Sequence, residues 1–183
     1  MRELFETIYR LYAKLLMVIA TLAAFGFFAI MWLIDANSLS RKFFNVPITG
    51  TLEITEAFMV IAILMPMAYT QMRRGHIRVT LVTKNFSPRW QRIFFTGSLI
   101  VGFLFAAWAT YASFIFFLRS YAIDEHAWGS IRFPIYPSKG AVALGMFLLT
   151  IQFLLDAIRV GVFGMDDPEF SDHGDEADEQ MET

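Results

Sequence analysis

Four long apolar stretches alternate with short polar segments along the chain. Each stretch has the length of a helix that crosses a bilayer, which takes about 20 residues. Polar boundaries mark where such a helix meets water, as Lys14 and Asp35 do around the first stretch. The pattern predicts an all-α membrane protein with four transmembrane helices, at about residues 15–34, 51–72, 93–118 and 138–162.

The second stretch combines a membrane-spanning pattern with two acidic residues. Its uncharged part, residues 57–72, is at the short end for a span, so the helix must begin near Thr51, after a Pro-x-x-Gly turn. This start draws Glu53 and Glu56 into or against the membrane, where carboxylates are costly and usually face protein. Pro66 lacks a backbone N–H, so we also expect a kink in this helix.

The third and fourth stretches constrain how the helices pack. Residues 93–118 are longer than a bilayer core requires, so this helix must tilt or extend beyond the membrane. Gly140 and Gly145 lie in the fourth stretch, and small residues let membrane helices approach closely.

The N-terminal segment, residues 1–14, is amphipathic. Leu4, Ile8 and Leu11 recur at helical spacing, while the charged residues fall largely on other faces. Two interpretations remain open. The segment lies flat at the membrane interface, or it is the wetted start of the first span.

Composition supports a membrane domain at residues 15–163 and excludes other classes. The chain is 56% hydrophobic, whereas soluble domains contain about 45–50% apolar residues. Cysteine is absent, which excludes disulfides, thiol catalysis and thiolate metal sites. Nine of the 17 acidic residues follow Met165, so we expect residues 164–183 to form an acidic, disordered cytoplasmic tail.

Basic residues are distributed unevenly between the two sides of the predicted membrane. With four spans, both termini and the loop at residues 73–92 share one side, which holds ten Lys and Arg residues against five on the other. The positive-inside rule therefore places both termini in the cytoplasm. Because these basic residues lie in loops between spans, they do not indicate nucleic-acid binding.

Glu53 and Glu56 are the main chemical candidates in the chain. In one interpretation they bind a cation, a proton or a substrate. In the other, which we favour, they neutralise a basic residue such as Arg41 or a partner's cation at the outer interface. No further metal ligands surround them, and the histidines lie in separate segments, so we expect no cofactor in this chain. Motifs for catalysis are absent, and we expect no enzyme activity.

An ordered set of motifs carries a resemblance to a known family. The first span is followed by Arg41 and by a Pro-x-x-Gly-x-x-Glu motif at residues 47–53. The second span ends in Arg-Gly-His-Ile-Arg-Val at residues 74–79, and a loop with two prolines follows the third span. Over residues 10–160 the chain resembles the small membrane subunit (DctQ type) of tripartite ATP-independent periplasmic transporters, the TRAP transporters.

The resemblance implies an accessory scaffold subunit in a bacterial inner membrane. In this family the small subunit pairs with a large multi-span membrane subunit that carries the substrate and sodium sites. A periplasmic solute-binding protein captures the solute, commonly an organic acid. Membrane lipids are further expected partners. Structural or partner-contact roles are expected for Arg41, Glu53, Glu56, Arg74, His76 and Arg78.

Two other functions remain open at this stage. One is a membrane anchor or assembly subunit of an unrelated membrane complex. The other is a small channel that assembles from copies of the chain.

Overall fold

The computed structural model describes residues 2–73, 88–129 and 131–161. These parts contain no β-strand, and four of their helical spans are long and apolar enough to cross a membrane, with α2 and α3 forming one span. The predicted all-α architecture with four spans is thereby confirmed. The helices are α1 (Arg2–Phe44), α2 (Thr51–Leu64), α3 (Met67–Met72), α4 (Pro88–Ala122) and α5 (Tyr136–Gly161).

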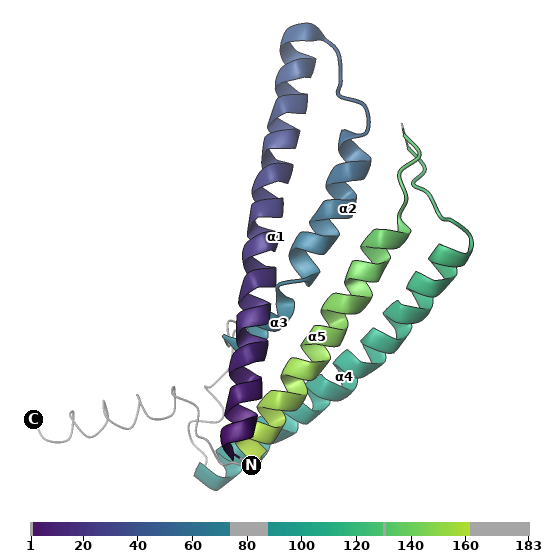
Figure 1. Cartoon of the computed structure of the whole chain (residues 1–183). Helices are drawn as coiled ribbons and strands as arrows, with labels where there is room; N and C mark the ends of the chain where they lie inside the picture. Colours follow the sequence, from purple (N-terminus) through teal and green to yellow (C-terminus); the bar gives the residue numbers. More distant parts are fainter. Residues whose placement is uncertain (1, 74–87, 130, 162–183) are drawn as a thin grey trace, which may run out of the picture.

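Helix α1 is much longer than the apolar stretch that predicts it. Its 43 residues correspond to about 64 Å at ~1.5 Å per residue, whereas a bilayer core is about 30 Å thick. Residues 2–14 and 35–44 prolong the helix on either side of its apolar part. The amphipathic N-terminal segment and the first span are therefore one continuous helix (Figure 1).

The second span is broken at Pro66, as its sequence predicts. Helix α2 ends at Leu64, where the N–H of Met65 still donates to the carbonyl of Ile61 at 3.1 Å. Proline cannot donate the next hydrogen bond of this ladder, and α3 resumes at Met67. Together α2 and α3 give the 22 residues that a span needs.

The spans lie side by side in an open row. Helix α1 packs against α2 and α3, these pack against α5, and α5 packs most extensively against α4. Figure 1 shows the helices gathered where α1 begins and α5 ends, and spread apart at the opposite end. We call these the terminal end and the loop end. An open row leaves two broad faces of the molecule uncovered.

The apolar core lies toward the terminal end and draws on every span. It consists of small and aliphatic side chains, namely Leu16, Ala68, Ala106, Leu148 and Leu149. The Tyr12 hydroxyl donates to the carbonyl of Leu148 at 2.5 Å, so a polar group of α1 is satisfied beside this core.

A glycine sets the distance between α2 and α5. A Cβ at Gly145 would lie 2.7 Å from the carbonyl oxygen of Leu64, which is a backbone atom. The predicted close helix contact is confirmed here. At Gly140 a Cβ would lie 3.1 Å from the Phe117 ring of α4, a tight contact with a side chain.

Candidate functional site

The candidate site is at the loop end, where the α1–α2 connection meets the α4–α5 hairpin. The α1–α2 connection is fixed by polar side chains of α1. Asn37 accepts a hydrogen bond from the N–H of Ile48 at 2.8 Å, and the Ser40 hydroxyl donates to the carbonyl of Val46 at 2.7 Å. These residues follow the apolar stretch, yet they do not end α1. They hold the returning chain against it.

Gly50 then turns the chain into α2. Its φ of +84° lies in the left-handed region that favours glycine, and a Cβ would lie 2.5 Å from the side chain of Ile131 in the α4–α5 hairpin. The Thr51 hydroxyl donates to the carbonyl of Ile48 at 2.7 Å, which closes the turn. The Pro-x-x-Gly motif thus serves both the turn and the contact with the hairpin.

Glu53 lies in the first turn of α2 and is 6% exposed. Its carboxylate packs so closely on Gly129 of the hairpin that a Cβ there would collide with it. The start of a helix also stabilises a negative charge, because unpaired backbone N–H groups point toward it. Glu53 therefore packs the start of α2 against the hairpin.

The hairpin between α4 and α5 has its own polar framework. The backbone N–H of Ala127 donates to the carbonyl oxygen of Phe133 at 2.7 Å, and the backbone N–H of Ile135 donates to the carbonyl oxygen of Glu125 at 3.0 Å. The Lys139 ammonium of α5 donates to the Glu125 carboxylate at 2.5 Å. The hydrogen bond from Lys139 lowers the pKa of Glu125 below its ordinary value.

The structure separates the two acids that the sequence grouped. Glu53 is buried against the hairpin, whereas Glu56, one turn further along α2, is exposed. Arg41 is exposed in the last turn of α1. The motif residues Arg74, His76 and Arg78 lie outside the described residues, as does the acidic tail at residues 164–183.

Two polar contacts were missed by sequence reasoning. Glu125 and Lys139 are 14 residues apart across a loop, so no helical spacing pointed to their pairing. In α5, the buried Gln152 amide donates to the buried carboxylate of Asp156 at 2.8 Å. The i, i+4 spacing of this second pair was available in the sequence.

The arrangement fits a structural site better than a reactive one. Within the described parts of the chain, no three His, Cys, Asp or Glu residues come together to hold a metal ion. The buried carboxylate of Glu53 connects the first turn of α2 to Gly129 of the α4–α5 hairpin. We call this contact between Glu53 and Gly129 the polar clamp.

These features define a multi-pass helical membrane protein with an open row of spans and a polar clamp at one end. The chain belongs to the family described as tripartite ATP-independent periplasmic transporters, DctQ component, which matches residues 30–161. This match covers about the last third of α1, residues 30–44, and all later helices. It confirms the family resemblance drawn from the motifs. A comparison with curated proteins finds no match. The protein is thus a small membrane subunit of a TRAP transporter.

Proposed function

We propose that this chain is the accessory scaffold subunit of a sodium-coupled, binding-protein-dependent importer of an organic acid or a similar solute. In this proposal it resides in a bacterial inner membrane with both termini in the cytoplasm. A large multi-span subunit carries the substrate and sodium sites, and a periplasmic solute-binding protein delivers the solute. The chain itself holds no cofactor and catalyses no reaction.

The open row of spans is the observation that supports this proposal best. Helices α1 and α4 stand at opposite ends of the row and do not pack extensively against each other. Their outward faces carry many exposed apolar side chains, among them Phe27, Trp108 and Phe116. Such a row braces a larger membrane protein, whereas a transporter acting alone must enclose a substrate path.

The motif residues then divide into internal and external roles. Glu53 holds the loop end together, because it is buried against the hairpin. Arg41 and Glu56 are exposed, which supports a role for them in contacting the large subunit or lipid head groups. We assign the same contact role to Arg74, His76 and Arg78 on the cytoplasmic side, from the sequence motif alone.

Purification of native complexes tests the proposal directly. The chain is tagged at its N terminus, extracted gently from its own membranes, and its partners are identified by mass spectrometry. A stoichiometric membrane protein of many spans, encoded beside a secreted binding protein, is the expected result. A stoichiometric enzyme subunit, or a defined oligomer of this chain alone, would overturn the scaffold role.

Substitution of Glu53 separates a clamp from an ion site. In the proposed role, Glu53→Gln lowers the amount of large subunit that co-purifies and leaves the sodium dependence of residual uptake unchanged. Glu56→Gln is the matched control on the same helix, because its side chain is exposed. Intact assembly with an altered sodium dependence in Glu53→Gln would show instead that Glu53 takes part in ion coupling.

A further inference from the structure

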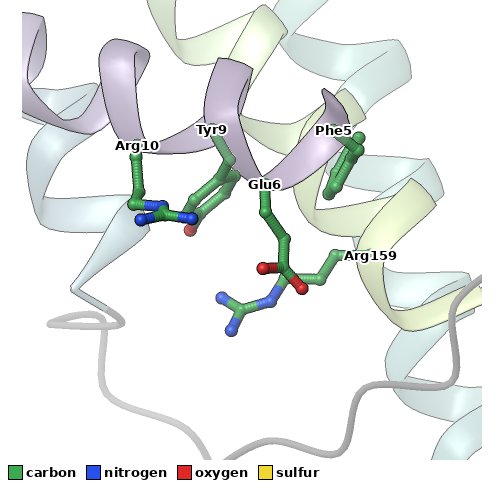
Figure 2. A pocket seen from close by; sticks show the side chains of 5 residues that line it. All are labelled: Phe5, Glu6, Tyr9, Arg10 and Arg159. Carbon is green, nitrogen blue, oxygen red and sulfur yellow. The ribbon is translucent and has the colours of Figure 1, made fainter. Parts of the chain in front are cut away.

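Two hollows flank the start of α1 at the terminal end. The first has a volume of about 380 Å³ and is lined by Phe5, Glu6, Tyr9, Arg10 and Arg159 (Figure 2). The second has a volume of about 280 Å³ and is lined by Thr7, Arg10, Leu11 and Lys14. Arg10 borders both hollows.

The residues that line the two hollows are mainly basic and aromatic. Together they contain three cationic side chains and one carboxylate, that of Glu6. The rings of Phe5 and Tyr9 stack with their centroids 6.3 Å apart, and the Arg159 guanidinium of α5 lies over the Tyr9 ring at 5.1 Å. Figure 2 shows Arg10 and Arg159 reaching into the same open space from two different helices. Net positive charge at this position favours an anionic ligand.

An exposed apolar strip on α1 leads away from these hollows. It begins at Leu11, which lines the second hollow, and its members follow at intervals of four and three residues, which keeps them on one helix face. Their side chains are 49–71% exposed. The strip extends about 21 Å along the helix, enough to cover one leaflet of a bilayer core that is ~30 Å thick. Its residues are Leu11, Leu15, Val18, Leu22 and Phe25.

We propose that the terminal end of α1 is a binding site for an anionic phospholipid. Arg10 binds the phosphate together with Lys14 or Arg159, and the acyl chains lie along the strip from Leu11 to Phe25. Arginine suits this task because its planar guanidinium donates two parallel hydrogen bonds to phosphate oxygens. A soluble phosphate compound would account for the cations and leave the adjoining strip unused.

The site rests on the proposed function in one respect, namely the cytoplasmic orientation of the termini. Anionic lipids give the cytoplasmic leaflet its negative surface potential, so the basic hollows then face the leaflet that supplies the ligand. Binding measured in detergent does not depend on this orientation. The lipid site and the scaffold role can therefore fail separately.

Native mass spectrometry of the full-length protein, purified with its co-purifying partners, tests the site. Phosphatidylglycerol and zwitterionic phosphatidylcholine are added in parallel, and the bound fraction is measured at a series of lipid concentrations. We expect preferential binding of phosphatidylglycerol, weakened about fivefold by Arg10→Gln and about fivefold again when Lys14→Gln is added. Arg119→Gln is the matched control, because Arg119 is an exposed cation at the loop end of α4.

The outcomes are distinguishable. Equal binding of the two lipids, or equal loss in the Arg119→Gln control, would overturn the site. Displacement of the lipid by inorganic phosphate alone would show that the hollows bind a soluble anion. Loss of the large subunit from Arg10→Gln, with lipid binding unchanged, would assign this face of α1 to the partner protein. In each variant an unchanged melting temperature verifies that the exposed substitutions leave the fold intact.

Discussion

The terminal end and the loop end of the helix row hold their helices together by different means. At the terminal end, aliphatic and small side chains from every span meet in one core around Leu16. At the loop end, a buried carboxylate and two glycines join an interhelical connection to a hairpin, at Glu53, Gly50 and Gly129. The terminal end is held by buried apolar surface, whereas the loop end is held by close steric contact between a side chain and glycines. The two ends therefore respond to different substitutions.

The largest expected loss of stability comes from a substitution at the terminal end. Leu16→Ala removes a fully buried side chain from a core that four spans share, and such truncations destabilise proteins by about 2–5 kcal/mol. Leu39→Ala on the same helix removes an exposed leucine, for which we expect a change within about 0.5 kcal/mol. Thermal unfolding of the purified protein in detergent measures both. Equal losses would show that the terminal core does not determine stability.

A smaller loss of stability is expected at the loop end, where two substitutions should partly compensate for each other. Gly129→Ala drives a Cβ into the Glu53 carboxylate, and overpacking of this kind costs about 1–3 kcal/mol. Glu53→Ala removes the obstructing group, so the double variant loses less stability than the two single changes predict. The interaction energy between the two substitutions, measured in this double-mutant cycle, should reach about 0.5–3 kcal/mol.

Glu56 provides the control for that cycle. Glu56→Ala, combined with Gly129→Ala, should give additive losses within about 0.5 kcal/mol, because Glu56 is exposed away from the clamp. Additivity in the Glu53 cycle itself would mean that the carboxylate and Gly129 do not constrain each other. The clamp would then have to be abandoned as the basis of the loop end.

The helices were predictable from sequence because their cause is local. Backbone groups in lipid must bond within their own segment, so a long uncharged run dictates a helix wherever it occurs. The break at Pro66 follows from one missing N–H, and it was predicted for that reason. The prolongation of α1 to Phe44 was not predicted, since Asn37 and Ser40 act through a connection that returns to them.

The clamp was only half predictable. Glu53 was identified because a carboxylate near lipid is costly, but the same argument identified Glu56 equally. Which of the two is buried depends on the approach of Gly129, more than 70 residues further along the chain. Helical periodicity carries no information about such a contact. The Glu125–Lys139 pair escaped prediction for the same reason, because a folded hairpin brings its members together.

The smallest expected effect is the pH dependence of that hairpin pair. Lys139 lowers the pKa of Glu125 by hydrogen bonding to its charged form. A lowered pKa in the folded state contributes stability above the ordinary value, about 4.3 for glutamate, and this contribution is lost as the pH falls through the lowered value. Melting temperatures from pH 7 to pH 3 should therefore converge between the unmodified protein and Glu125→Gln.

The exposure of the pair explains why this effect ranks last. Both side chains are about one-third exposed, at 30% and 32%, so water screens their attraction and weakens its contribution. Lys139→Gln should reproduce the behaviour of Glu125→Gln, because either change removes one of the two charges of the same ion pair. A gap between the unmodified protein and the variants that does not narrow from pH 7 to pH 3 would show that Glu125 supports the hairpin without its charge. The loop end would then depend on shape alone, through Gly50, Glu53 and Gly129.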